Sequence, residues 1–445
     1  MQTPSAPLER CDVVVIGGGP GGSVAAALLA RKGHKVIQIE KDHHPRFHIG
    51  ESLLPMNMPI YERLGVMDKL KAMGIHKPGA DFEARNERGY NTYLFARALG
   101  KSPPHAYQVW RQDFDKMLFD HARECGADGR EGAEVTAVEQ RGARDTRVEV
   151  RVGDGKSYTI ETRYLLDASG RDAFMASKMR IRKKNPQHQS AAIFGHFRKA
   201  EFRPGSDRGN ISIYNFEYGW MWMIPLPDGV MSVGAVCRPD YLKQRRGRTK
   251  EFLFETLQQN KALWKRMTDA ELIDGEVRVT GNYSYEATHI GGLGWMLVGD
   301  AFVFLDPVFS SGVYLATSGA EQTAALVDEV LAHPEREARL QRKLEHRLRK
   351  GMRRFAFFIY RFNSPVMQHL FQNPRNTWQI EQGVISMLAG DLFDSWKVQL
   401  RLYLFKFIYA AYAVRHWRSF YREHRYRIAQ ARAQFTGGNT PVDRL

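Results

Sequence analysis

The segment from Asp12 to Glu40 constrains the fold more than any other part of the sequence. Residues 12–16 form an apolar run typical of a buried parallel strand, and residues 17–22 are rich in glycine. Residues 21–31 are rich in alanine and leucine, as in a helix, and a second apolar run at 35–39 ends on Glu40. This order of strand, turn, helix and strand predicts a parallel α/β sheet that begins near the N-terminus.

The glycines of the turn have the spacing Gly17-x-Gly19-x-x-Gly22, which suits the binding of a dinucleotide. Gly17 permits the tight turn, Gly19 lets the backbone approach a pyrophosphate, and Gly22 lets the helix pack closely on the strand. The phosphates would lie at the helix N-terminus, and Glu40 stands where an acceptor for a ribose hydroxyl is expected. A purely structural glycine turn is the alternative, which the surrounding elements disfavour.

Patterns typical of the cofactor unit return late in the chain, so we expect two units that are interleaved in sequence. A turn at Pro227-Asp228-Gly229 predicts a hairpin between residues 220–226 and 230–236. The predicted organisation is a cofactor-binding domain of residues 10–80, 105–180 and 285–335, an antiparallel β-sheet substrate domain of residues 81–104 and 181–284, a mainly helical C-terminal region of residues 336–435, and a flexible tail of residues 436–445.

Two later motifs narrow the dinucleotide to FAD. Gly299-Asp300-Ala301 follows an apolar run and resembles the second FAD motif of aromatic hydroxylases, in which the aspartate binds the ribityl chain. The segment 167–171, Asp-Ala-Ser-Gly-Arg, resembles the intermediate motif of the same class. Asp300 alone would read as an ordinary helix N-cap. The resemblance implies an α/β fold with a Rossmann-like FAD-binding domain of the aromatic-hydroxylase type.

A tryptophan-rich string in the middle of the chain points to a narrower family. Trp220 and Trp222 lie two residues apart, so on a strand they share one face. A bare pair would indicate two aromatic side chains in the floor of a sheet. The full string of residues 219–225, Gly-Trp-Met-Trp-Met-Ile-Pro, resembles the signature of flavin-dependent halogenases. In that family this string separates the flavin from the substrate.

Several further positions resemble the same family, over roughly residues 10 to 330. The resemblance implies FAD contacts for Arg46, Ser52, Arg111 and Gly312, and a halide held by the backbone N–H groups of Ser311 and Gly312. Backbone donors suit a halide because they stabilise an anion without giving up a proton. The substrate side, by the same resemblance, comprises Trp220, Trp222, Ile224, Pro225 and Phe309.

The residue that the resemblance makes catalytic is Lys77, in the segment 74–80. Its role in the family is to guide hypohalous acid to the substrate, either by hydrogen bonding as an ammonium or by forming a haloamine as an amine. The sequence leaves these two forms open. The alternative is an ordinary surface lysine.

One position departs from the tryptophan-acting branch of the family. Phe309 stands where those enzymes carry a glutamate, so the sequence resembles the branch that acts on phenols and pyrroles. The implied function is an FADH2- and O2-dependent halogenase that installs chloride or bromide on such an aromatic, free or tethered to an acyl carrier protein. A separate flavin reductase would supply FADH2. An FAD-dependent monooxygenase and a geranylgeranyl-reductase-like oxidoreductase are the alternatives.

The overall composition adds a location and a question about partners. Three widely spaced cysteines argue against a metal site and disulfides, and with the lack of a signal peptide or apolar span they predict a cytoplasmic protein. No nucleic-acid-binding module is evident, although the net charge is +16. Arginines after residue 414 suggest an acidic carrier protein or peripheral contact with an anionic membrane through basic helices. Just before these arginines, an apolar stripe would either face the membrane or pack on the catalytic body. The stripe comprises Leu402, Phe405, Tyr409 and Tyr412.

Overall fold

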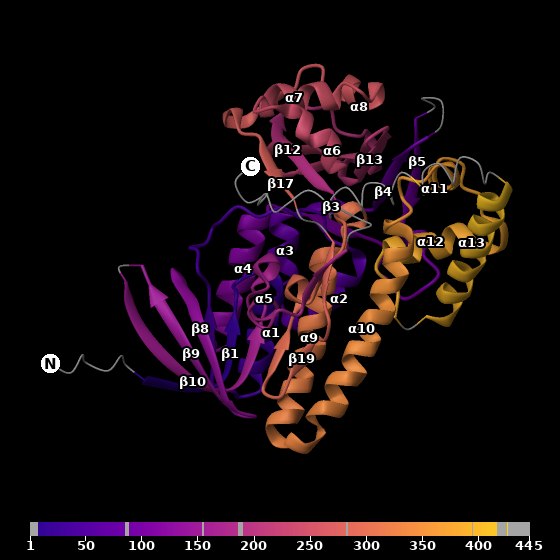
Figure 1. Ribbon diagram of the computed structural model, residues 1–445. Helices are drawn as coiled ribbons and strands as arrows, with labels where there is room; N and C mark the ends of the chain where they lie inside the picture. The colour runs from indigo at the N-terminus through magenta and orange to yellow at the C-terminus, as the bar shows by residue number, and fades with distance from the viewer. Residues whose placement is uncertain are drawn as a thin grey trace.

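The computed structural model of this 445-residue chain contains two large sheets, a cluster of C-terminal helices and the smaller elements that connect them (Figure 1). The structure describes residues 8–84, 89–153, 155–185, 190–281, 284–393, 395–415 and Arg425. The predicted tail of residues 436–445, and the arginines beyond Arg415 other than Arg425, lie outside the described residues.

The first sheet is the predicted parallel sheet. Its strands run, in spatial order, β19 (Gly291–Gly292), β20 (Trp295–Leu297), β10 (Lys156–Asp167), β1 (Leu8–Ile16), β2 (Val36–Ile39) and β7 (Asp128–Arg130). From β20 to β7 every neighbouring pair is parallel. Strand β1 is central, and Val13, Val14 and Val15 are fully buried, as expected for a strand that is covered on both faces.

Helices and a β-meander cover this sheet. Helix α1 (Pro20–Arg31) follows the glycine turn with proline at its first position, and it packs against α4 (Arg111–Glu124) and α9 (Ser311–Ala332). Strands β8 (Ala133–Gly142) and β9 (Asp145–Val152) extend β10 as an antiparallel meander. The helix N-termini of α1 and α9 follow the carboxyl ends of β1 and of the segment after β20, the edge at which α/β sheets bind ligands.

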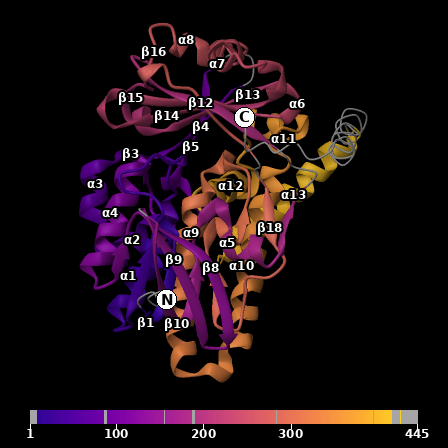
Figure 2. The same ribbon diagram turned by 60° about the vertical axis from the view of Figure 1, so that its left-hand side comes forward.

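The second sheet is largely antiparallel and lies above the first in the views of Figures 1 and 2. Its order is β16 (Glu271–Leu272), β12 (Ala191–Arg198), β15 (Val230–Cys237), β14 (Gly219–Leu226), β13 (Ile211–Phe216), β4 (Gly79–Glu83) and β5 (Tyr90–Leu94), with β17 (Arg278–Thr280) also on β12. The predicted hairpin is present as β14 and β15, which pair over their full length.

The two faces of the second sheet pack in opposite directions. Phe194, Trp220 and Trp222 belong to the core shared with the first sheet, whereas Met221 and Met223 belong to a separate core. That second core is closed by helices that were not expected within residues 181–284: α6 (Pro239–Leu242), α7 (Thr249–Leu257) and α8 (Lys261–Arg266). They arise because β14 and β15 are apolar on both faces, so the face away from the first sheet also needs a cover.

Short elements connect the two sheets. They are β3 (Ile75–Lys77) paired with β6 (Ala106–Gln108), the three-stranded sheet of β11 (Arg182–Lys184), β18 (Tyr285–Ala287) and β21 (Val303–Phe304), and helices α2 (Met58–Leu64), α3 (Met67–Met73) and α5 (Phe174–Lys178). Strand β11 pairs with β18, which joins a segment of the predicted substrate domain to a segment of the predicted cofactor domain.

The C-terminal region is helical as far as the structure describes it. It comprises α10 (Glu337–Ile359), α11 (Pro365–Gln372), α12 (Ile380–Leu388) and α13 (Trp396–Arg415). The predicted stripe on α13 faces inward, because Leu402, Phe405 and Tyr409 are at most 6% exposed. Phe405 packs on Phe358 of α10 with ring centroids 5.0 Å apart. Of the two alternatives for this stripe, packing on the body of the protein is therefore the one that the structure has, and these three residues do not face a membrane.

Candidate active site

A cavity of about 880 Å³ lies between the carboxyl edge of the first sheet and the inner face of the second. Most of the predicted site residues line it, although they come from six separate stretches of the chain. They are Gly17, Gly19, Glu40, Arg46, Ser52, Arg111, Trp220, Trp222, Ile224, Asp300, Ser311 and Gly312. The cofactor side and the substrate side of the prediction thus share one enclosed space.

Glycine is found at the three positions of the first turn for different physical reasons. Gly17 has φ +105°, and a Cβ on Gly22 would lie 2.1 Å from the Gly17 carbonyl oxygen, so both glycines are required by the protein itself. Gly19 has φ −77°, and the nearest atom to a Cβ there would be Nη2 of Arg46 at 3.9 Å. Because neither backbone nor packing requires glycine at position 19, the open space above it fits a bound group such as a pyrophosphate.

Glu40 and Arg46 form a charged rim beside this turn. The Glu40 carboxylate accepts hydrogen bonds from the Gly18 N–H at 2.6 Å and the Asp42 N–H at 3.0 Å. Arg46 Nη2 donates to the same carboxylate at 3.2 Å. Glu40 is therefore held at the end of β2, where a ribose hydroxyl could reach it, and the Arg46 guanidinium adds positive charge next to the glycine turn.

Arg111 begins α4 and is held by two groups. It forms a bidentate ion pair with Asp115 at 2.8 and 2.9 Å, and its Nη1 donates to the Ile49 carbonyl at 2.8 Å. A Cβ on Gly50 would lie 2.9 Å from the same nitrogen, so glycine at this position with φ +107° lets the guanidinium approach. These contacts tie the loop around Ser52 to α4.

The two aspartates of the later FAD motifs have different surroundings. Asp300 lines the cavity, and burial raises its pKa to about 6, against the opposing effect of the Arg171 and Arg111 charges. Asp167 does not line the cavity; its carboxylate accepts the N–H groups of Ser169 and Met175 at 3.0 and 2.7 Å. Asp300 is thus free to accept hydrogen bonds from a ligand, whereas Asp167 holds the start of α5 in place.

The predicted halide loop ends at the N-terminus of α9. Asp306 caps the loop by accepting the Val308 N–H at 3.2 Å, and Ser310 adopts a left-handed conformation with φ +55°. The chain then enters a 22-residue helix at Ser311, so the N–H groups of Ser311 and Gly312 are in its first turn, where the helix dipole favours an anion. A Cβ on Gly312 would meet nothing within 4 Å, which leaves open space on the cavity side.

The tryptophan string forms the opposite wall. Trp220, Trp222 and Ile224 line the cavity from the same face of β14, as the two-residue spacing predicts. The ring centroids of the two indoles are 5.7 Å apart. Trp222 Nε1 donates to Ser232 Oγ at 3.2 Å. A Cβ on Gly234 would lie 2.6 Å from the Trp222 ring, so glycine at that position of β15 creates the room for the indole.

Lys77 lies behind this cavity rather than in its lining. It is 1% exposed, and its Nζ donates to Ser52 Oγ at 2.8 Å and to the Leu53 carbonyl at 2.9 Å. Burial lowers the pKa of the amine to about 7. The alternative of an ordinary surface lysine is wrong, and Ser52, which does line the cavity, connects the amine to it.

Gly22, Pro225 and Phe309 also lie outside the cavity lining. Pro225 follows Ile224 on β14, so by strand alternation it faces away from Ile224. Phe309 is 3% exposed and packs on Phe362 and Phe371, with ring centroids 5.5 and 6.1 Å away. Phe309 therefore joins the predicted halide loop to the C-terminal region.

The comparisons with known proteins agree with this arrangement. A sequence profile for the FAD binding domain matches residues 10–354. The chain is 31% identical to the myxobacterial chondrochloren halogenase, a variant of FAD-dependent halogenases, and the two structures match with a TM-score of 0.75 over 89% of this chain and 96% of that one. This chain belongs to the flavin-dependent halogenase family. Its fold class and its cofactor, FAD, are as the sequence predicted.

Members and neighbours of the family differ in the activities for which they are named. A tryptophan 2-halogenase from Chondromyces crocatus is 35% identical over 337 residues, which cover 75% of this chain and 63% of that protein. The chain thus spans less than two thirds of that relative. A flavoprotein/dehydrogenase from Cytophaga hutchinsonii is 30% identical and matches with a TM-score of 0.80 over 87% of this chain and 94% of that one.

The sequence assigned no role to Glu51, which lines the cavity, or to its partner His196. Glu51 is 1% exposed, lines the cavity and pairs with His196 Nε2 through Oε1 at 2.6 Å, while its Oε2 has no hydrogen-bond partner in the described part of the chain. The sequence carried a partial signal for His196, because it follows Ala192 and Phe194 at alternate positions on the inward face of β12. A polar residue in such a row is unusual.

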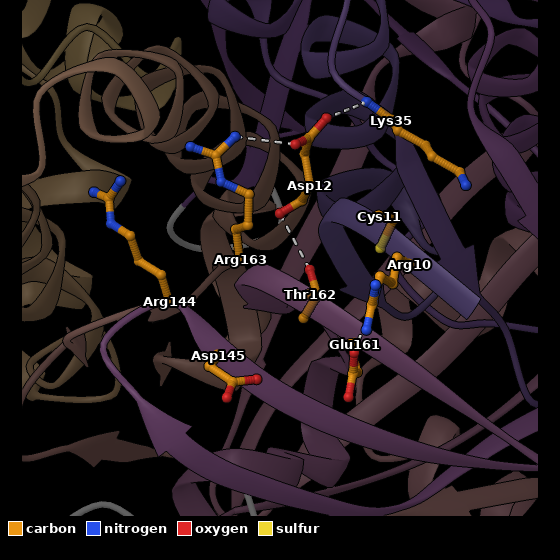
Figure 3. A pocket seen from close by; sticks show the side chains of 9 residues that line it. All are labelled: Arg10, Cys11, Asp12, Lys35, Arg144, Asp145, Glu161, Thr162 and Arg163. Atoms are coloured by element: carbon orange, nitrogen blue, oxygen red, sulfur yellow. Dashed lines mark hydrogen bonds and ion pairs between the residues drawn. The ribbon is translucent and has the colours of Figure 1, made fainter. Parts of the chain in front are cut away.

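A second hollow of about 400 Å³ lies near the amino-terminal ends of β1 and β10 (Figure 3). Its charged side chains largely neutralise one another, as in the pairs of Arg163 with Asp12 at 3.1 Å and Arg10 with Glu161 at 2.9 Å. Ligands of α/β sheets bind at the opposite, carboxyl ends of the strands. This hollow is therefore no part of the halogenase site.

Proposed function

We propose that this chain is a halogenase that uses FADH2, O2 and chloride or bromide to halogenate an electron-rich aromatic, phenolic or pyrrolic in kind. The observation that carries the proposal is a single cavity lined by the glycine turn, the N-terminus of α9 and the paired indoles of Trp220 and Trp222. Such a cavity has a phosphate cradle, an anion site and an apolar wall in one enclosed space.

The residues that would hold FAD are those of the cofactor side. The pyrophosphate would lie over Gly19 near Arg46, a ribose hydroxyl would reach Glu40, and the ribityl chain would reach Asp300. Bound reduced FAD, with oxygen and halide, supplies the oxidised halogen as hypohalous acid. The N–H groups of Ser311 and Gly312 would hold the halide, since a helix N-terminus favours an anion without transferring a proton.

Lys77 is the residue to which we assign capture of hypohalous acid. Its pKa of about 7 makes protonated and neutral forms comparably populated near neutral pH. In either form its two hydrogen bonds, to Ser52 Oγ and the Leu53 carbonyl, orient Nζ from behind the cavity wall. A rotation of the Ser52 side chain would open the way from Nζ to the cavity.

We also propose that Glu51 accepts the proton that leaves the aromatic ring. When a ring carbon takes the halogen from hypohalous acid, the ring loses a proton and hydroxide leaves, so water and the halogenated product balance the reaction. Glu51 lines the cavity, its buried Oε2 has no hydrogen-bond partner among the described residues, and His196 holds the other oxygen. A buried carboxylate in this position suits general base catalysis.

The substrate class rests on Phe309 and on the chemistry of the ring. Phenols and pyrroles activate their own ring carbons through lone pairs, so they need less help from a carboxylate in the halide loop. The similarity to a tryptophan 2-halogenase makes indoles the class to test against them. We further propose that a separate flavin reductase supplies FADH2, and that the substrate is either a free small molecule or an acyl-carrier-protein thioester.

The test is a product assay with the purified full chain, FAD, a flavin reductase, oxygen, and bromide or chloride. The panel contains a phenol, a pyrrole, tryptophan and carrier-bound aromatics, and mass spectrometry reads the bromine or chlorine isotope pattern. We expect halogen in place of hydrogen on a phenol or pyrrole. Halogenation of tryptophan alone would contradict the substrate class and leave the halogenase assignment intact.

The Lys77→Ala variant tests the assigned lysine. We expect halogenated product to disappear while reduced flavin is still reoxidised, because the flavin site does not include this side chain. Lys71→Ala is the matched control, since Lys71 is 56% exposed on α3. Halogenation by the Lys77→Ala variant at the wild-type rate would contradict the role of Lys77.

A second candidate function is flavin-dependent oxidoreduction without halogen. The similarity to a flavoprotein/dehydrogenase, with 94% of that chain covered, is the observation that favours it. The same product assay separates the two, because a monooxygenase adds one oxygen and a dehydrogenase or reductase changes the hydrogen count. Either result without halogen would replace the first proposal.

A further inference from the structure

Helix α13 has an apolar face that is not used to pack on the protein. Its inward face, with Leu402, Phe405 and Tyr409, is at most 6% exposed. Five large apolar side chains on the other side are exposed: Trp396 (67%), Leu400 (44%), Tyr403 (62%), Phe407 (73%) and Val414 (74%). We call these five residues the outer stripe.

The outer stripe is continuous along the helix. Its members are three, four or seven residues apart, so at 3.6 residues per turn they follow one line over about 27 Å. They make up half of the ten large hydrophobic side chains that are exposed among the described residues. Single exposed apolar residues are ordinary, but a row of five on one helix marks an interaction surface.

The charges around the outer stripe have one sign. On the helical wheel Lys397 and Arg415 border it on one side and Lys406 on the other. The sequence from Ser395 to Arg422 contains no aspartate or glutamate. Figures 1 and 2 both show α13 at the periphery of the molecule, away from the first sheet, and the five side chains of the outer stripe are exposed.

We propose that α13 docks on an anionic lipid surface, with the outer stripe inserted among the headgroups and the basic residues on the lipid phosphates. Tryptophan and tyrosine favour the bilayer interface, and lysine and arginine beside them add attraction to anionic lipid. No helix within the described ranges has the length and hydropathy to cross a membrane, so α13 lies along the surface.

The same charges argue against a second copy of this chain as the occupant. Two α13 helices packed through their outer stripes would bring their lysines and arginines together, with no carboxylate in residues 395–415 to neutralise them. The proposal does not depend on the halogenation chemistry, because none of the residues that line the cavity belongs to α13.

The test is flotation of the full chain with vesicles of phosphatidylcholine alone and of phosphatidylcholine with phosphatidylglycerol. We expect the protein to float with the anionic vesicles, at least tenfold more than with the neutral ones, and to be released by high salt. The double variant Tyr403→Ser/Phe407→Ser should lose at least tenfold in bound fraction, because both side chains are solvent-exposed and their loss leaves the fold unchanged.

Two controls isolate the surface. Leu293→Ser removes an equally exposed apolar residue (57%) elsewhere and should float as the wild type does. Lys397→Glu/Arg415→Glu should abolish the preference for anionic vesicles. Circular dichroism and product formation on a soluble substrate should be unchanged in the Tyr403→Ser/Phe407→Ser variant.

Five results would overturn the proposal. Two of them concern flotation itself: no flotation with either vesicle, and equal flotation of the wild type and the Tyr403→Ser/Phe407→Ser variant. A dimer in solution that becomes monomeric in that variant would make a second copy of the chain the occupant. Flotation that appears only when residues 416–445 are removed would make the chain's own terminus the occupant. Binding of an acidic carrier protein through the outer stripe in place of vesicles would overturn it as well.

Discussion

At the scale of single residues, the buried amine of Lys77 is the most informative group in the molecule. It has two hydrogen-bond acceptors, Ser52 Oγ and the Leu53 carbonyl, and no carboxylate of the described residues lies within bonding distance. Its pKa of about 7 results from burial alone. A lysine held in this way costs stability wherever it must carry its charge, which is tolerated when the amine has a chemical task.

The stability of the protein should therefore depend on pH through Lys77. Between about pH 7 and the ordinary lysine pKa, the unfolded chain binds the proton and the folded chain does not, so stability rises with pH. Below pH 7 both states are protonated and the cost is constant. Lys77→Met removes this cost, so its melting temperature relative to wild type should be highest at pH 6 and fall steadily towards pH 9.

Thermal unfolding at pH 6, 7, 8 and 9 measures this difference. Lys71→Met, at an exposed position, should show the same difference from wild type at every pH. A Lys77→Met difference that is also constant with pH would mean that the amine titrates near its ordinary value.

Glu51→Gln tests the proposed proton acceptor. The amide keeps the shape of the side chain and a hydrogen bond with His196 but is not a base. Loss of a general base typically slows a reaction by about 10²- to 10⁴-fold. We expect a fall of that order in product formation, with hypohalous acid still detected by a chemical trap in solution.

A second glutamate–histidine pair offers the control for this variant. Glu131 pairs with His44 at 2.8 Å and does not line the cavity. Glu131→Gln should leave product formation unchanged. Wild-type rates for Glu51→Gln would assign the proton to another acceptor.

At the scale of elements, two helix N-termini make the site. The N-termini of α1 and α9 both open on the cavity, and each has a glycine that the protein's own packing does not require: Gly19 just before α1 and Gly312 in the first turn of α9. A glycine without a steric reason in the protein indicates the approach of something that binds there.

Gly19→Ala and Gly22→Ala should therefore have opposite effects. An alanine at position 19 meets no protein atom closer than 3.9 Å and has an allowed φ, so the fold should keep its melting temperature while FAD affinity falls at least tenfold. An alanine at position 22 would lie 2.1 Å from the Gly17 carbonyl, so the protein itself should be destabilised. FAD titration by flavin fluorescence measures the affinity of each variant, and thermal unfolding measures its stability. Unchanged FAD affinity in Gly19→Ala would contradict a pyrophosphate at this position.

The elements around the glycine turn were predictable because their signals are local. An apolar run, a turn and an alanine-rich helix follow one another within about thirty residues, and the hairpin at Pro227 is marked by its own turn. The Glu51–His196 pair joins residues 145 positions apart, so no local pattern contains it. Helices α6 to α8 were missed for a related reason: they cover a sheet face whose exposure only the assembled fold reveals.

The orientation of α13 was predicted only in part. The stripe that the sequence pattern indicated is real, and it packs inward. The outer stripe has the same helical spacing, so periodicity alone could not tell which face meets the protein. The positions of α10, α11 and α12, which all pack on the inward face of α13, decide it.

At the scale of the whole molecule, one aromatic cluster joins its parts. Phe371 of α11 packs on Phe82 of β4, Phe309 of the halide loop and Phe362 after α10, with ring centroids 5.0 to 6.1 Å apart. The second sheet, the active-site loop and the C-terminal helices thus share one contact.

Truncating Phe371 should weaken all three at once. Phe371→Ala removes a side chain that is 2% exposed, and such changes cost about 3 to 5 kcal/mol. We expect a clear fall in the melting temperature and lower halogenase activity, since the loop that ends at Ser310 loses its support. Trp378→Ala, at a residue 69% exposed in the same region, should change neither. An unchanged melting temperature in Phe371→Ala would mean that these parts are held together elsewhere.

The order of strands in the first sheet also governs how this protein is made. Strand β10 pairs with β20, so residues 165–167 cannot form this pairing until residues 295–297 have been synthesised. During synthesis that interval lasts on the order of ten seconds, during which the end of β10 is an open edge and the nascent chain has only half of a flavin site. Expression at low temperature, or with chaperones that bind such edges, should raise the yield of active protein. Any fragment that ends before Trp295 should be insoluble, even if it contains the complete glycine turn.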